Sequence, residues 1–238
     1  PMRPHNLPLV IIGAGLLWFG WLAFNAGSAT AANNTAGVAF MNTFAATCAA
    51  AIGWLLTEKI RDGHATSLGA ASGVVAGVVA ITPACAAVSP MGAMAIGVIA
   101  GVLCALAVGL KYKLMYDDSL DVVAVHLVGG LAGTLLIGLF ATEASPTGIN
   151  GLLYGGGLDQ LGKQAVGAGA VLGYSLVVTA IIALVIKAIM GLRVTEEQEV
   201  GGIDLAEHAE SGYELGDTGG GGAFAGIGHA AHNKSEVE

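Results

Sequence analysis

Charged residues are scarce in this chain: only 11% of its 238 residues are charged and 6% are aromatic. With 55% hydrophobic residues and a mean hydropathy of +0.74, the composition excludes an ordinary soluble domain and is typical of a polytopic membrane protein. Catalytic signatures such as HExxH and GxSxG are also missing. The sequence therefore predicts a membrane protein that is not an enzyme.

Cysteine is equally sparse. Cys48, Cys85 and Cys104 each stand alone in an apolar stretch, and their odd number argues against a disulfide framework. His229 and His232 have a spacing that suits a metal, but they lie in a Gly-rich tail where solvated side chains are expected. We predict no metal site and no cofactor.

Long apolar runs are what the chain has in abundance. Each is long enough to cross a bilayer as a helix, because a lone strand would leave backbone groups unpaired in lipid. Glycines recur at four-residue spacing within these runs, which predicts close helix packing. We expect an all-α, polytopic transmembrane bundle of about six spans, at about 7–31, 36–60, 66–88, 90–113, 120–142 and 163–192.

Charge asymmetry predicts the orientation. Basic residues gather in alternate loops, and the positive-inside rule makes that set cytoplasmic. We therefore expect a protein of the cell membrane with both termini of this chain on the cytoplasmic side. Ten of the 17 acidic residues follow Arg193, so the net charge of −8 belongs to the tail. We expect a membrane domain over 1–193, in contact with the lipid bilayer, and a cytoplasmic tail over 194–238. We expect no nucleic-acid partner.

Two polar residues interrupt the fifth run. In an α-helix Asp121 and His126 would lie about 140° apart, so they are not expected to share a face. Asp121 is placed to cap and anchor the cytoplasmic end of its helix as a structural acid, or alternatively to tune a pathway electrostatically. His126 lies deeper, beside a strip of glycines, and indicates a functional site in a narrow lumen. The structural alternative is a hydrogen bond to a neighbouring helix.

The first run holds a second candidate site. Phe24 and Ser28 are four residues apart and share one helix face. An aromatic face attracts a cation, and a hydroxyl oxygen accepts a hydrogen bond from an N–H donor. Taken alone, the two residues are equally compatible with a role in packing.

Four segments together resemble the ammonium transporter family (Amt, Mep and the related Rh proteins). They are GAGLLWFGWLAFNAGSA, AITPACAAVSP, DDSLDVVAVHLVGGLAGTL and GLRVTEEQEVGGIDLAEHAESGYE. The resemblance implies a protomer of eleven helices assembled as a homotrimer, and the six runs here resemble the sixth to eleventh. It also implies ammonium or ammonia as the substrate.

The resemblance assigns roles to individual residues. It implies that Phe24 and Ser28 belong to an outer recruitment site, and that Phe24, Ser28 and His126 line the pore. Asp121 corresponds to the conserved acid before the pore histidine, and Thr82 lies in another conserved segment. The family's partner histidine belongs to helices with no counterpart here, so we expect a fragment or a truncated form of the inverted repeat.

The tail also matches the family. The resemblance implies that it docks a PII-type signalling protein, through Arg193, Glu196, Glu197, Asp204 and Tyr213. Two functions remain open: transport through a narrow apolar pore, with deprotonation of ammonium, or a membrane sensor that docks the PII-type protein without conducting.

Overall fold

The computed structural model of this chain describes residues 4–211. Within them the regular structure is helical, and the isolated bridge between Val88 and Ala141 belongs to no strand. This confirms the all-α prediction. The α-helices are α1 (Leu7–Gly27), α2 (Asn34–Asp62), α3 (Ser67–Ile81), α4 (Pro90–Ala107), α5 (Leu110–Leu114), α6 (Gly129–Phe140), α7 (Asp159–Ile189) and α8 (Glu196–Gly201). Two π-helical segments, Val123–Val128 and Asp204–His208, and one 3₁₀ turn, Leu152–Tyr154, complete the described structure.

The chain divides into two compact units, Pro1–Ser175 and Leu176–Glu238. The first contains α1 to α6 and the beginning of α7, and the second contains the remainder of α7, α8 and the rest of the tail. The division falls inside α7, whereas the sequence places the end of the membrane domain at residue 193, so that boundary remains a prediction.

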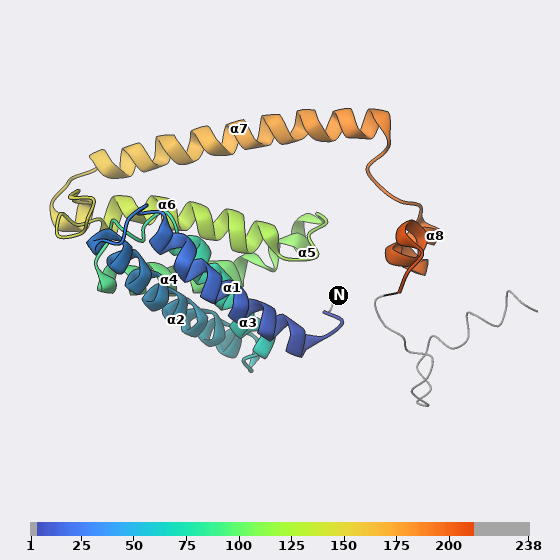
Figure 1. Cartoon of the computed structure of the whole chain (residues 1–238), viewed down its shortest axis with the longest axis horizontal. Helices are drawn as coiled ribbons and strands as arrows, with labels where there is room; N and C mark the ends of the chain where they lie inside the picture. Colours follow the sequence, from blue (N-terminus) through green and yellow to red (C-terminus); the bar gives the residue numbers. More distant parts are fainter. Residues whose placement is uncertain (1–3, 212–238) are drawn as a thin grey trace, which may run out of the picture. The chain divides into compact units, whose positions relative to one another are not determined.

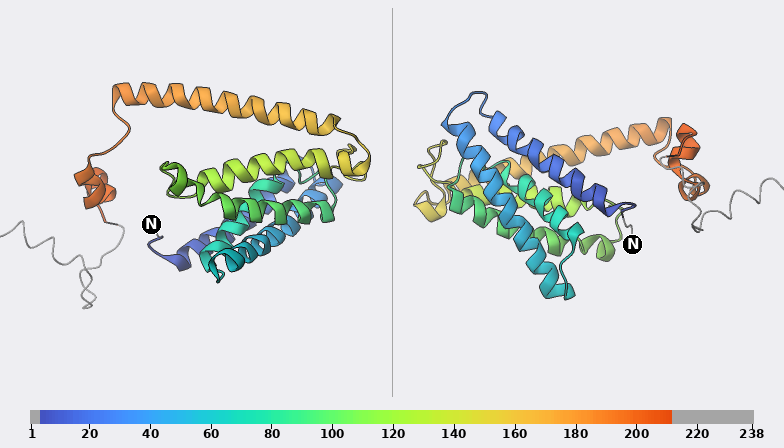
Figure 2. Two further views of the ribbon diagram at one scale, coloured as in Figure 1. Left: turned by 180° about the vertical axis from the view of Figure 1, so that it is seen from behind. Right: turned by 60° about the horizontal axis from the view of Figure 1, so that its bottom comes forward.

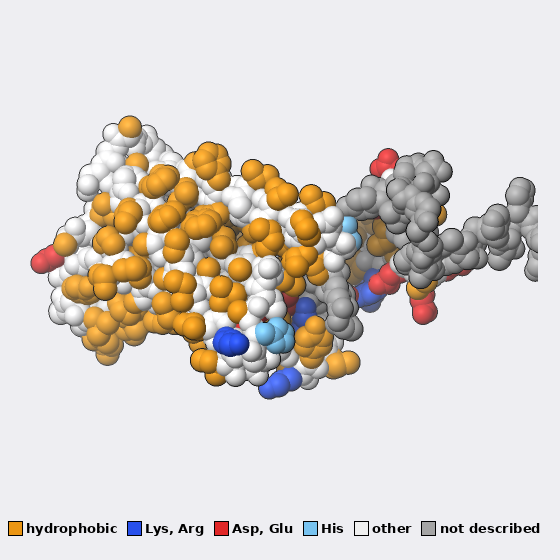
Figure 3. Space-filling view, turned by 90° about the horizontal axis from the view of Figure 1, so that it is seen from below, with side chains coloured by type: hydrophobic (Ala, Val, Ile, Leu, Met, Phe, Trp, Pro, Cys, Tyr) orange, Lys and Arg blue, Asp and Glu red, His pale blue; other side chains and the backbone are white. Residues whose placement is uncertain are grey.

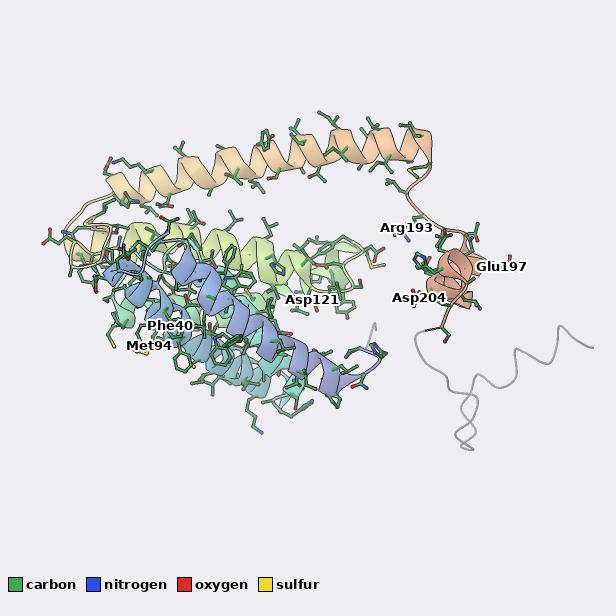
Figure 4. All side chains as sticks on the ribbon, in the orientation of Figure 1. Phe40, Met94, Asp121, Arg193, Glu197 and Asp204 are labelled. Atoms are coloured by element: carbon green, nitrogen blue, oxygen red, sulfur yellow. The ribbon has the colours of Figure 1, made fainter. Side chains whose placement is uncertain are left out.

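Helices α1 to α4 and α6 form one bundle (Figures 1 and 2). Helix α2 packs against α3 and α4, α1 packs against α2 and α3, and α6 packs against α3 and α4. Hydrophobic side chains are spread widely over the face of the molecule in Figure 3. Phe40 of α2 and Met94 of α4, for example, are 48% and 37% exposed (Figure 4). An apolar exterior of this kind suits a lipid environment.

Among the described residues, five helical stretches are long and apolar enough to cross a membrane. They are Leu7–Gly27, Asn34–Asp62, Pro90–Leu114, Val123–Phe140 and Asp159–Ile189. The prediction of six such spans needs one correction, because the apolar helix α3 has only 15 residues. The molecule is nevertheless a polytopic helical bundle, as expected.

The third run stops being helical at Ile81, although apolar residues continue to Val88. Pro83 has no N–H to continue the helix, and the chain proceeds in tight turns. Asn42 of α2 donates its amide protons to the carbonyls of Cys85 and Val88, each at 2.8 Å. These bonds satisfy carbonyls that the break leaves without helical partners, which permits irregular backbone inside the bundle.

Small residues bring the helix backbones close together. A Cβ added at Gly97 or Gly101 of α4 would meet the carbonyl oxygens of Ala46 and Ala50 on α2. A Cβ at Gly133 of α6 would likewise meet a backbone carbonyl of α3. The predicted close packing is therefore present at these positions. It is absent at Gly169 and Gly173 of α7, which have the same four-residue spacing, because an added Cβ there would have no atom within 4 Å.

Candidate functional site

His126 lies in the π-helical segment Val123–Val128, which leads into α6. A π-helical turn is wider than an α-helical turn, since its hydrogen bonds join residues five apart. The neighbouring Val125 is buried, and its carbonyl lies 3.9 Å from the thiol sulfur of Cys104 on α4. His126, by contrast, is exposed. The segment is thus held against α4 at Val125, while the neighbouring His126 is exposed.

On one side of His126 lies a cavity of about 450 Å³. The positive-inside prediction would place this end of the bundle at the cytoplasmic side. Its walls come from α1, α3 and the residues leading into the π-helical segment, and they are mostly apolar. Its lining includes Gly13, Ala14, Leu17, Leu68, Ala71, Ser72, Val75, Ser119, Asp121 and His126.

On the other side of His126 lies a second cavity, of about 540 Å³. Its lining includes Trp21, Val79, Thr82, Leu127, Gly130, Leu131 and Thr134. Among the described residues, His126 is the one that lines both this cavity and the first. A third hollow, of about 340 Å³, shares Leu17 with the first cavity and Trp21 with the second. The three hollows therefore adjoin one another along the face formed by α1, α3 and α6, and residues 167–175 of α7 also line the second cavity.

Asp121 and His126, which were not expected to share a helix face, both line the same 450 Å³ cavity. The prediction assumed an unbroken α-helix from residue 120. Asp121 instead precedes the helix in a left-handed conformation, with φ of 58°, and the following turn is π-helical. Both departures change the angle between two residues five apart.

The capping part of the role assigned to Asp121 was wrong. The carboxylate of Asp118 accepts the backbone N–H groups of Val122 and Val123, at 2.8 and 2.9 Å. Asp121 pairs instead with Lys111 of α5, whose Nζ lies 2.7 Å from its Oδ1. Sequence reasoning missed both the cap made by Asp118 and the ion pair between Asp121 and Lys111, although an Asp placed just before a helix is itself a capping signal. Figure 4 shows Asp121 at the end of the segment near α5.

At the opposite end of α1, Phe24 is 66% exposed and lines the 340 Å³ hollow. Its ring meets Trp21 edge to face, with centroids 5.9 Å apart and planes at 67°. The Ser28 hydroxyl donates to the carbonyl of Asn25 at 2.7 Å, which leaves the oxygen's lone pairs available to an outside donor. The two predicted recruitment residues therefore present an aromatic face and an acceptor at the same end of α1.

Thr82 has a position that the sequence alone did not explain. Its hydroxyl accepts the indole N–H of Trp21 at 2.8 Å and donates to the carbonyl of Val78 at 2.6 Å. Asn25, which is 2% exposed, lies 3.3 Å from the same hydroxyl and donates to Thr43 of α2 at 3.0 Å. This set of hydrogen bonds ties α1 to α2 and α3 behind the aromatic pair, and it fixes Trp21 where it borders two of the hollows.

In the second unit, α8 begins with a capping box. Thr195 accepts the N–H of Gln198, and the Gln198 side chain accepts the N–H of Thr195. The four predicted docking residues inside the described range, Arg193, Glu196, Glu197 and Asp204, are all exposed (Figure 4). The fifth, at position 213, lies outside the described residues.

Known ammonium transporters resemble this chain in sequence. The sequence profile of the Ammonium Transporter Family matches residues 1–213. An ammonium transporter of Mycobacterium tuberculosis is 64% identical over 219 residues, which are 90% of this chain and 46% of that protein. An ammonium transporter of Aquifex aeolicus is 48% identical over 213 residues, or 89% of this chain and 50% of its own length.

Two solved structures also resemble this chain in fold. Saccharomyces cerevisiae Mep2 superposes with a TM-score of 0.73 at 37% identity, over 82% of this chain and 48% of that one. A structure titled "Sensor Amt Protein" gives a TM-score of 0.77 at 34% identity, over 85% of this chain and 49% of that one.

The fold and the site together define a multi-pass helical membrane protein with a histidine-bearing face. This chain belongs to the Ammonium Transporter Family, as its profile match and its relatives show. It spans about half the length of the curated relatives that it matches.

Proposed function

We propose that this chain supplies one side of a conduit through which a cell membrane takes up ammonium as ammonia. The observation that supports this most directly is the position of His126, whose ring adjoins one cavity on each side along a mostly apolar face. A permeating molecule that followed this face would pass the imidazole. The names of the relatives, which are ammonium transporters, favour the same substrate.

The energetics favour deprotonation before passage. Moving an ion into hydrocarbon costs on the order of 20 kcal/mol by an idealised Born estimate. A desolvated cation–π contact, such as Phe24 could offer, returns only about 2 kcal/mol. Releasing a proton near neutral pH costs about 3 kcal/mol if the pKa of the ion lies about two units above ambient. Ammonium is therefore expected to lose its proton rather than cross intact.

Each site residue then has a separate role. Phe24 and Ser28 would receive the cation at the outer end of α1, with the aromatic face and the hydroxyl lone pairs already exposed there. Trp21, fixed by Thr82, would form the wall between this hollow and the cavity next to His126. His126 would hydrogen-bond the neutral molecule and, with a partner outside this chain, pass on the proton.

Uptake in a completed chain tests the proposal. The relative from M. tuberculosis is similar enough that this chain can replace its matching half, and we call the resulting protein the completed chain. Vesicles containing it should accumulate labelled methylammonium faster than protein-free vesicles and should carry a current in ammonium. The unaltered relative serves as the positive control. If the completed chain inserts and folds like the relative but takes up nothing, the proposal is wrong.

The assembly and the tail belong to the same proposal. We expect the completed chain to be a homotrimer in a cell membrane, with both ends of this chain in the cytoplasm. The acidic, exposed α8 region would dock a PII-type signalling protein as an addition to transport. We rank a sensor that does not conduct second, since both curated relatives reported above are named as transporters, although one structural neighbour is titled "Sensor Amt Protein".

Docking can be measured with the completed chain. Replacing Glu197 and Asp204 by Lys should weaken the binding of a PII-type protein by about tenfold or more, because two exposed charges change sign. Biolayer interferometry on detergent-solubilised protein would give the affinity. Replacing Glu143 and Asp159, which are both exposed in the first unit, by Lys is the matched two-charge control. Equal binding by all variants would contradict a dock at this tail.

A further inference from the structure

Lys111 is an unusual lysine. It lies on the short helix α5, yet its side chain is only 8% exposed. Its ammonium nitrogen lies 2.7 Å from Oδ1 of Asp121 and donates to the carbonyl of Asp118 at 3.0 Å. Lysines are rarely buried unless they are paired, and burial makes the pair costly to break from one side. Lys113, two residues further on, is exposed.

The residues that Lys111 contacts lead directly into the segment that carries His126. The Asp118 carboxylate caps Val122 and Val123, the residues that begin the helix. The carbonyl of Asp121 accepts the N–H of Val125 at 2.9 Å, one residue before the imidazole. Lys111 therefore connects α5 to Asp118 and Asp121, the two residues whose hydrogen bonds hold the start of the segment that carries His126.

This segment also has two conformations that are rare without support. Asp121 has φ of 58°, a left-handed value that a non-glycine residue adopts at a cost. Residues Val123–Val128 are π-helical, a form that usually occurs as an isolated turn at a functional site. Such conformations persist only where surrounding contacts hold them in place. Outside the backbone ladder, the segment is held by the carboxylate of Asp118, by the ammonium group of Lys111 and, at the carbonyl of Val125, by the thiol of Cys104.

We propose that Lys111 is a positioning residue for His126. Its ion pair with Asp121 holds the left-handed turn and the π-helical segment, and through them it keeps the imidazole on the wall shared by the two cavities. The inference rests on the proposed function for its effect on transport, but its structural part stands independently. Lys111 itself does not line either cavity.

The transport test compares three variants of the completed chain. Lys111→Met keeps the aliphatic length and removes the charge, so His126 should lose its alignment and the maximal uptake rate should fall about 10- to 100-fold. The half-saturating concentration should change little, because Phe24 and Ser28, the proposed recruitment residues, lie at the end of α1 opposite the cavity that Asp121 lines. Lys111→Arg, which keeps the charge, should retain most of the rate. Lys113→Met, the matched control on the same helix, should leave transport unchanged.

A second measurement covers the case in which Lys111→Met lowers the amount of folded protein. Hydrogen exchange followed by mass spectrometry should show amides 122–128 exchanging about tenfold faster in Lys111→Met than in the parent or in Lys113→Met. Amides in the middle of α2 should exchange at the parent rate. Unchanged exchange at 122–128 overturns the inference, and so does a normal uptake rate in a folded Lys111→Met protein.

The two proposals fail in different ways. If the folded completed chain takes up no methylammonium, the proposed function fails, while the exchange result still decides whether Lys111 holds the segment. If uptake is normal in the parent and equal in Lys111→Met, the function stands and the positioning role falls. A uniform rise in exchange throughout the bundle would show a general loss of stability and would also overturn the inference.

Discussion

Replacing His126 by Ala in the completed chain should abolish the ammonium-dependent current, with a loss of at least about 100-fold, the lower range for removing a proton-transferring side chain. The expected loss is large because His126 is the side chain that borders both cavities along the proposed path. Alanine would leave space for the substrate but no group to hydrogen-bond it or to move its proton. Solid-supported membrane recordings of proteoliposomes would measure the current.

The matched control is His64→Ala. His64 is an exposed histidine in the loop between α2 and α3, and it lines neither cavity beside His126. Its loss should leave the current unchanged. A full current from a folded His126→Ala protein would remove the imidazole from the transport mechanism, whatever its position in the structure.

The second large effect is expected on stability. Asn42→Leu should lower the free energy of unfolding by about 2–5 kcal/mol, because it leaves the carbonyls of Cys85 and Val88 without their side-chain donor. The site is fully buried, so water has no direct access to replace the bonds. Thermal unfolding of the detergent-solubilised protein, followed by tryptophan fluorescence, would measure the loss.

Thr47→Val provides the comparison for this variant. Thr47 lies on the same helix and is equally buried, but its hydroxyl donates only to the Thr43 carbonyl of its own helix. Valine preserves the shape, and the change should cost about 1 kcal/mol or less. If Asn42→Leu proved as mild as Thr47→Val, the non-helical turn would not depend on the amide.

Several features could be predicted because they follow from local sequence. The Pro90 helix begins where Ser89 accepts the N–H of Gly92, and α3 begins where Thr66 accepts the N–H of Gly69. These are ordinary capping signals before apolar runs. The membrane-spanning character follows from run length alone, and the family resemblance quoted from four segments is confirmed by the profile match.

Other features could not be predicted, because they depend on contacts between distant residues. The helical end at Ile81 is stabilised by Asn42, some forty residues away along the chain. The turn at Asp121 depends on an ion pair with Lys111, which lies across a loop on another helix. No local pattern distinguishes that lysine from the exposed Lys113, so the carboxylate's partner and its left-handed backbone were both missed.

The sequence by itself determined that this chain is an all-helical membrane protein with one histidine inside an apolar run. That follows because hydrocarbon demands long apolar helices and makes each polar exception conspicuous. Only the tertiary structure decided that Asp121 and His126 line one cavity and that Asp118, not Asp121, caps the helix. The physical reason is that backbone conformations outside the α region are chosen by the contacts that compensate for them, and those contacts exist only after the helices have packed.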